Sequence, residues 1–139
     1  MSWLVWALLS AVFAGLTAVL AKVGVKDVDS NLATAIRTVV ILIFAWTVAL
    51  SRSDQRLSSV SPRTWLFLVL SGLATGASWL CYFRALQLGQ VSKVAPIDKL
   101  SVVLVALFGV IFLGERLGDV NWLGVAMIAG GAILVAYRF

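Results

Sequence analysis

The chain has 139 residues, of which 62% are hydrophobic and 12% are charged, and its formal net charge is +5. Soluble globular domains are only about 45–50% apolar, and a soluble chain this short could not bury so much apolar surface. The composition therefore excludes a soluble catalytic domain and predicts a protein whose solvent is lipid. The basic residues form no run, so the positive charge does not indicate nucleic acid.

Five apolar stretches are each long enough to cross a bilayer, which takes about 20 residues. They cover residues 3–21, 32–50, 65–83, 94–113 and 120–137. Backbone polar groups in lipid must be satisfied within their own segment, so each stretch is predicted to be a helix. The long unbroken apolar runs contradict the alternating pattern of a small barrel. We therefore predict an all-α, polytopic membrane domain that takes up residues 1–139.

The connections between these stretches are short and polar. The first span lacks Lys or Arg before its apolar run, so we expect it to be retained rather than removed as a signal peptide. Residues 51–63 form the most polar loop, and Ser61-Pro62 at its end is typical of a helix start. Residues 84–88 can extend the third span as a turn at the interface. Basic residues near span ends indicate topology signals and contact with lipid headgroups.

The basic residues of the predicted loops divide almost evenly between the two sides of the membrane. The amino-terminal side carries four, Arg52, Arg56, Arg63 and Arg116, and the other side carries five, Lys22, Lys26, Arg84, Lys93 and Arg138. Orientation follows the Lys/Arg excess, so a chain with almost none could insert both ways. We therefore consider an antiparallel, dual-topology homodimer. The alternative is a single orientation in which Arg84 or Lys22 lies inside a helix and does not count.

Three ionisable residues fall within predicted spans, where charge is costly and often functional. Arg37 lies about a turn and a half into the second span, where it either faces a water-filled cavity or snorkels to the interface. Asp98 and Lys99 are neighbours in the fourth span, so their side chains should point about 100° apart and not face each other. Arg37 could pair with Asp98. Structural pairing without any substrate stays an alternative.

Other residues suggest how such a site could be built. Trp79 and Tyr82 lie deeper in the third span than the Trp and Tyr residues near span ends, and could line a cavity. Pro96 removes a backbone donor and frees a carbonyl near Ser92, which favours a binding site or a gate. Glu115 is expected to close a helix and hold the following loop. We count Pro96, Glu115 and Arg84 as structural or gating candidates.

Several chemistries lack their essential residues. Histidine is absent and Cys81 is the single cysteine, so we expect no metal site, no cofactor and no disulfide. No pair of nucleophile and base is recognisable, so we expect no enzyme. Within the spans, Arg37 and Lys99 outnumber Asp98, which favours an anionic or zwitterionic substrate over a bare cation.

Several motifs, taken in order, resemble the EamA family of the drug/metabolite transporter superfamily. They are the run Ala-Leu-Gln-Leu-Gly-Gln-Val-Ser-Lys-Val-Ala-Pro-Ile at 85–97, then Leu113-Gly114-Glu115-Arg116-Leu117, then Trp122-Leu123-Gly124 to Gly130-Gly131. Ala35-Ile36-Arg37 also looks like a basic position that this family often carries in its second span. The resemblance runs from about Trp3 to Ala136. Where many relatives are apolar after the proline, this chain has Asp98-Lys99, so their substrates cannot be transferred to it.

Most members of that family have ten spans in two inverted repeats, and this chain is similar to one repeat. The resemblance implies export or exchange of small metabolites by alternating access, with the site between two halves. Together with the charge count, it leads us to expect a secondary transporter in the bacterial inner membrane, an antiparallel homodimer surrounded by membrane lipid. Arg37 and Lys99 would hold polar substrate groups, Asp98 would pair or carry a proton, and Trp79 and Tyr82 would pack on apolar parts.

A second function stays open beside this one. The chain could be a non-catalytic membrane subunit, half of a heterodimer with a paralogue, serving for example a flippase for lipid-linked sugars. A one-to-one partner of similar size would distinguish this subunit from a chain that pairs with itself.

Overall fold

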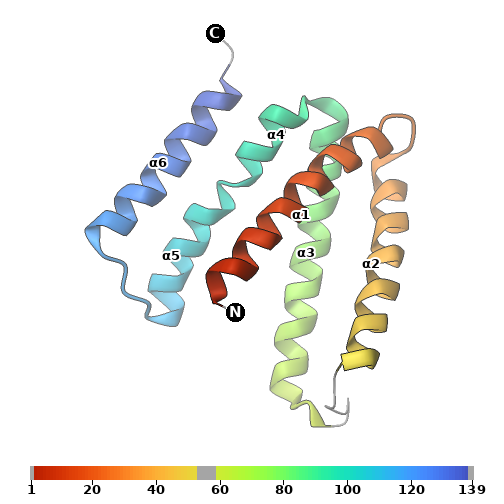
Figure 1. Ribbon diagram of the computed structural model, residues 1–139, viewed down its shortest axis with the longest axis horizontal. Coiled ribbons are helices and arrows are strands. Elements are labelled where there is room, and N and C mark those ends of the chain that lie inside the picture. Colours follow the sequence, from red (N-terminus) through yellow and green to blue (C-terminus); the bar gives the residue numbers. More distant parts are fainter. Residues whose placement is uncertain (1, 53–58, 138–139) are drawn as a thin grey trace. The chain divides into compact units, whose positions relative to one another are not determined.

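A computed structural model describes residues 2–52 and 59–137 of the chain. Within these ranges the regular elements are helices, drawn in chain order in Figure 1. They are α1 (Trp3–Gly24), α2 (Ser30–Arg52), α3 (Pro62–Leu88), α4 (Val91–Asp98), α5 (Ser101–Leu113) and α6 (Asp119–Ala136). The described ranges leave out residues 53–58 of the predicted polar loop, which include Arg56. They also leave out Arg138, another of the basic residues counted for the topology.

The helices include five segments long and apolar enough to cross a membrane. Four of these segments are α1, α2, α3 and α6, and the remaining one, Val91–Leu113, consists of α4 followed by α5. The prediction of an all-α polytopic membrane protein with about five spans is confirmed. The helix α3 runs on through Arg84 to Leu88, past the end of its apolar core.

Local polar groups set the ends of several helices. The carboxylate of Asp29 accepts hydrogen bonds from the backbone N–H groups of Asn31 (2.9 Å) and Leu32 (3.1 Å) at the start of α2. The hydroxyl of Ser61 accepts one from the N–H of Thr64 (3.2 Å) at the start of α3. Both residues thereby satisfy donors that have no partner inside the helix. The helix start predicted at Ser61-Pro62 is confirmed.

The chain divides into two compact units. One unit, residues 20–87, holds α2, α3 and the last turn of α1. Here the ammonium group of Lys22 donates a hydrogen bond to the carbonyl of Leu86, and Gln87 Nε2 donates to the carbonyls of Val25 (3.3 Å) and Val28 (2.6 Å). Leu86 and Val25 are almost fully buried. These contacts tie the turn between α1 and α2 to the end of α3.

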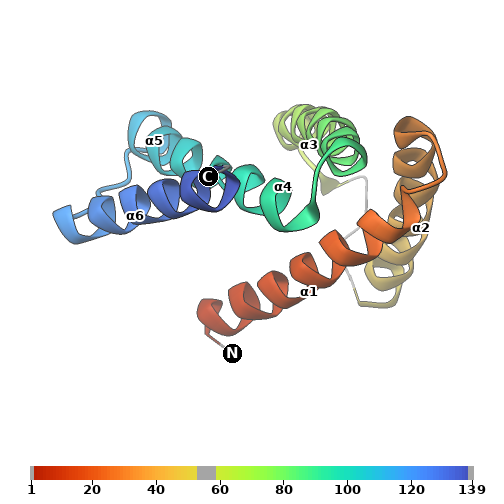
Figure 2. The same cartoon turned by 90° about the horizontal axis from the view of Figure 1, so that it is seen from above.

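The other unit comprises residues 1–19 and 88–139, and in it α4 and α5 both contact α6 (Figure 2). Lys99 and Leu100 form a turn between α4 and α5, although the sequence reads as one apolar span. Around the turn the bonding changes to i→i−3, with Leu100 N–H donating to Ile97 and Val102 N–H to Lys99, each at 3.0 Å. Pro96, which lacks a backbone donor, lies just before the break. The sequence predicted loosening near Ser92, and the structure shows the break at 99–100.

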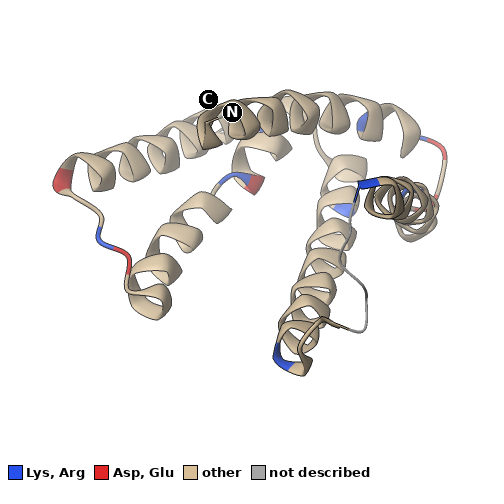
Figure 3. Cartoon of the chain, turned by 60° about the horizontal axis from the view of Figure 1, so that its bottom comes forward, with Lys and Arg blue, Asp and Glu red and all other residues tan. Residues whose placement is uncertain are grey.

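Large apolar side chains remain exposed along every span, as a protein surrounded by lipid requires. Val39 on α2, Phe67 on α3 and Val105 on α5 are each more than half exposed. Charged positions are few and gather mainly near helix ends, as Figure 3 shows. This surface is suited to hydrocarbon or to another apolar subunit, because in water it would exceed what a soluble monomer exposes as a continuous patch.

Candidate functional site

The candidate site in residues 20–87 is built around Arg37. This residue lies seven positions after the start of α2, which places it about 10 Å along the helix axis. Its guanidinium carbon lies 4.5 Å from the ring centroid of Trp79 and 5.4 Å from that of Phe83. The quadrupole of an aromatic ring attracts a cation placed over its face. The rings therefore stabilise a charge that lies well inside a membrane span.

The aromatic residues come from one stretch of α3. Trp79 and Phe83 are four positions apart, so their side chains share a face of the helix. Tyr82 contacts Phe83 edge to face, with ring centroids 6.5 Å apart and an interplanar angle of 64°. Trp79 and Tyr82 were predicted from the sequence, whereas Phe83 was missed. The sequence signal for Phe83 was its spacing of four residues from Trp79, which places both side chains on one face of the helix.

Arg37 keeps its hydrogen-bonding capacity. Among the residues that the structure describes, its guanidinium forms neither an ion pair nor a hydrogen bond. A guanidinium has five N–H donors in a fixed fork that matches carboxylate and phosphate groups. The rings thus hold the cation while its donors remain available to an anionic group.

Asp98 and Lys99 lie in the other unit, at the break between α4 and α5. Lys99 Nζ is 3.3 Å from Asp98 Oδ2, and their side chains are 56% and 35% exposed respectively. The expectation that these neighbours cannot face each other is wrong, because α4 ends at Asp98 and Lys99 belongs to the following turn. The pairing of Arg37 with Asp98 stays a prediction, since the two residues belong to different units.

The remaining candidates lie at helix ends. Glu115 follows Gly114, which caps α5 with φ +67°, and the Glu115 N–H donates to the carbonyl of Gly109 (3.1 Å). The Glu115 carboxylate also folds back over Gly109, with Oε2 only 2.6 Å from where a Cβ on that glycine would lie. Arg84 Nη1 donates to Gln87 Oε1 (3.0 Å), next to the contact between α3 and the α1–α2 turn. Both placements are those of residues that stabilise helix ends.

In the part of the chain that the structure describes, no group of three or more His, Cys, Asp or Glu residues could hold a metal ion. What the described residues do provide is a set of membrane-length helices with a guanidinium held on aromatic rings inside one span. They define a polytopic integral membrane protein.

A sequence model of the EamA-like transporter family matches residues 1–137, and the chain belongs to this family. It is 65% identical, over 97% of its length and 96% of the relative's, to an "uncharacterized transporter in cobO 3'region" from Sinorhizobium sp. It is also 30% identical, over 51% of its length and 24% of the relative's, to an "uncharacterized transporter" from Vibrio cholerae. No solved structure matches the chain.

Proposed function

We propose that this chain is a secondary transporter that moves a small anionic or zwitterionic metabolite across a bacterial cytoplasmic membrane by alternating access. The observation that carries the proposal is the guanidinium of Arg37, seated on Trp79 and Phe83 without an acidic partner in the described chain. Ionisable groups at membrane depth are costly and mark substrate or ion pathways. Membership of a transporter family supports the same role.

Arg37 binds the anionic group of the substrate in this proposal. A carboxylate or phosphate can accept two parallel hydrogen bonds from the guanidinium, which fixes its orientation as well as its position. Trp79 and Tyr82 then contact the apolar part of the molecule. A cation already held by rings loses little side-chain freedom when the substrate arrives, which favours binding.

The break between α4 and α5 supplies a second polar position. Discontinuous membrane helices commonly form the sites of secondary transporters, because their unwound backbone can coordinate polar groups. Lys99 leaves Asp98 and binds a polar group of the substrate instead. Asp98, now without the Lys99 ammonium beside it, takes up a proton. The exposed ion pair, 3.3 Å long, is weak enough to break at each cycle.

Two copies of the chain in opposite orientations form the transporting unit. Three observations support this pairing: the nearly balanced basic residues, the large exposed apolar surface, and the length of the Vibrio relative, of which the matched region covers only 24%. Transporters built from inverted repeats place their site near the midplane between the two halves. An antiparallel homodimer reproduces that arrangement with one gene product.

The test uses the full chain in liposomes with a pH gradient and a panel of labelled carboxylates, phosphates and amines. We expect uptake of anionic or zwitterionic solutes, its loss in Arg37→Gln and partial retention in Arg37→Lys. Arg63→Gln is the matched control, since Arg63 also lies over a ring, that of Phe67 at 6.0 Å, but at the first turn of α3. Full uptake by folded Arg37→Gln protein contradicts the proposal.

The subunit composition is tested by affinity purification at native expression levels. We expect a single chain that crosslinks to itself. Recovery of a paralogue in a one-to-one ratio would instead make the chain half of a heterodimer, and transport would then require both proteins.

A further inference from the structure

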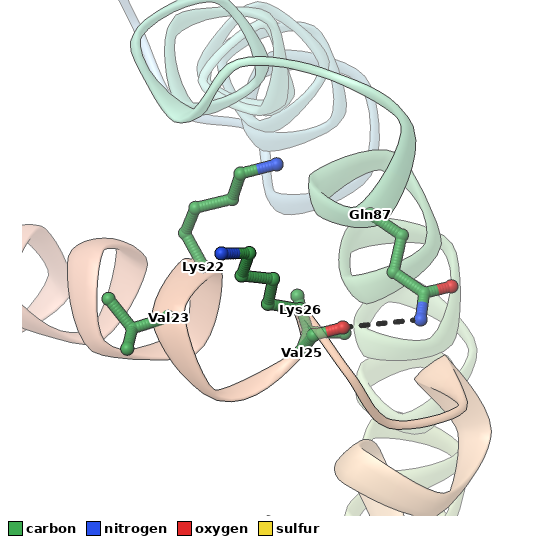
Figure 4. Close-up of a pocket in the computed structure, with 5 residues that line it drawn as sticks. All are labelled: Lys22, Val23, Val25, Lys26 and Gln87. Atoms are coloured by element: carbon green, nitrogen blue, oxygen red, sulfur yellow. Dashed lines mark hydrogen bonds between the residues drawn. The ribbon is translucent and has the colours of Figure 1, made fainter.

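A pocket of about 530 Å³ lies where the end of α1 meets the end of α3, and its residue Gln87 is one helical turn beyond Phe83 of the Arg37 site. Its lining residues are Lys22, Val23, Val25, Lys26 and Gln87. In Figure 4 the Lys22 side chain extends toward α3, whereas the Lys26 side chain extends back over the last turn of α1. Nothing in the transport mechanism uses this pocket.

The polar groups of the pocket leave a positive charge available. The ammonium of Lys26 makes no hydrogen bond or ion pair with the residues of the described ranges. Lys22 donates a hydrogen bond to the carbonyl of Leu86. This bond keeps the positive charge of Lys22 at the same end of α3. Arg84 adds a further cation through its bond to Gln87.

The nearby carboxylates do not neutralise these cations by direct pairing. Asp29 is directed at the start of α2, where it accepts from the N–H groups of Asn31 and Leu32. Asp27 forms no ion pair among the described residues. An anion entering the pocket therefore meets the ammonium of Lys26, which no described residue pairs with.

The pocket also has an apolar side that continues along a membrane span. Val23, which lines it, is 71% exposed, and Leu20 on the preceding turn of α1 is 70% exposed. Lysines at the end of a span lie at headgroup depth, and the exposed apolar side chains before them lie at acyl-chain depth. A ligand with a negative head and a hydrocarbon tail matches both parts.

We propose that this pocket binds the phosphate group of an anionic phospholipid, with Lys26 and Lys22 on the phosphate and Leu20 and Val23 along an acyl chain. Basic pockets at the membrane surface are a recognised way to bind lipid headgroups. Lysine binds phosphate as a point charge and needs no fixed approach direction. The bound lipid would stabilise the contact between the α1–α2 turn and α3 that Gln87 makes.

The experiment measures lipid binding to the purified full chain in detergent by native mass spectrometry and by thermal unfolding, with phosphatidylglycerol, phosphatidylcholine and inorganic phosphate as probes. We expect phosphatidylglycerol to bind and to raise the unfolding temperature, and phosphatidylcholine to do neither. Lys26→Gln should weaken phosphatidylglycerol binding about fivefold, the effect of one lysine near a membrane surface, while Lys26→Arg should retain it. Lys26 is exposed and unpaired, so both variants should fold.

Arg116→Gln is the matched control, because Arg116 is also an exposed cation outside the helices, between α5 and α6. It should bind phosphatidylglycerol as the wild type does. Equal losses in Lys26→Gln and Arg116→Gln would reveal only a general charge effect and overturn the proposal. Binding of inorganic phosphate as tight as that of phosphatidylglycerol would also overturn it, since the site would then select a soluble anion.

Discussion

The guanidinium carbon of Arg37 lies 4.5 Å from the centre of the Trp79 ring, so a cation of α2 rests on an aromatic face of α3 inside the membrane-spanning part of both helices. A cation–π contact of this kind contributes about 0.5–2 kcal/mol. The contact allows a charged donor to stay in an apolar region without a carboxylate that would compete with an anionic substrate.

Replacing Trp79 should therefore weaken substrate binding more than folding. We expect Trp79→Leu to raise the apparent KM for transport by about 3- to 30-fold, the range of a lost cation–π contact. Trp79→Phe, which keeps a ring, should stay close to wild type. The measurement is initial uptake into liposomes at a series of substrate concentrations. An unchanged KM in Trp79→Leu would show that the ring does not position Arg37.

The side chain of Gln87 should hold the end of α3 to the turn before α2. Gln87→Leu leaves the carbonyl of buried Val25 without this donor, which should cost about 1–3 kcal/mol of unfolding free energy. Denaturation of the protein in detergent measures the loss. Gln90→Leu is the control, because Gln90 precedes α4 and makes no side-chain capping bond. Equal stability of the two variants would contradict the assigned role of Gln87.

The regularity of α4 should depend on Pro96. Pro96→Ala adds an N–H that can donate to the Ser92 carbonyl and make α4 more regular, so we expect amide hydrogen exchange within α4 to slow by about tenfold, and transport to slow with it. Pro62→Ala provides the control, since Pro62 occupies the first position of α3, where a missing donor costs little. Unchanged exchange in Pro96→Ala would mean that Pro96 does not loosen α4.

Gly114 should be required for the end of α5. Its φ of +67° is a left-handed conformation, so Gly114→Ala should destabilise the protein by about 1–2 kcal/mol. At Gly118 the φ is −74° and a new Cβ would meet nothing within 4 Å, so Gly118→Ala should be tolerated. Thermal unfolding of both variants in the same detergent tests the difference, and a larger loss in Gly118→Ala would refute it.

The orientation of the chain should respond to the removal of two basic residues from one side. With four and five basic residues on the two sides, a reporter at the carboxyl end should be found on both sides of the membrane. Arg52→Gln with Arg63→Gln leaves two basic residues against five and should bring that end to the cytoplasm, whereas Lys26→Gln with Lys93→Gln leaves four against three and should only shift the mixture outward. Side-specific labelling of the reporter distinguishes these outcomes. A wild-type reporter on one side only would exclude dual topology.

The membrane character of this protein was predictable from sequence because it depends on composition and run length alone. Each apolar stretch must form its own backbone hydrogen bonds in lipid, so the helices of α1, α2, α3 and α6 follow without knowledge of any neighbour. The helix start at Ser61-Pro62 was equally local. A charge inside an apolar span likewise identifies Arg37 as a candidate site residue from the sequence alone.

Contacts between distant segments were not predictable in the same way. Phe83 escaped the sequence analysis because nothing in its own run distinguishes it from a lipid-facing ring, and only the approach of α2 to α3 places it under Arg37. The turn at Lys99 and Leu100 was missed because an apolar run reads as continuous even where the backbone changes its bonding.

The sequence by itself thus determined that the chain is a set of membrane-spanning helices and which of them carry charge, since burial in lipid follows from apolar length. The tertiary structure alone decided which partners those charges meet. Arg37 contacts aromatic rings, and Asp98 pairs with Lys99. These contacts depend on how each helix is rotated and on where a helix breaks, and neither is encoded in the periodicity of a uniformly apolar segment.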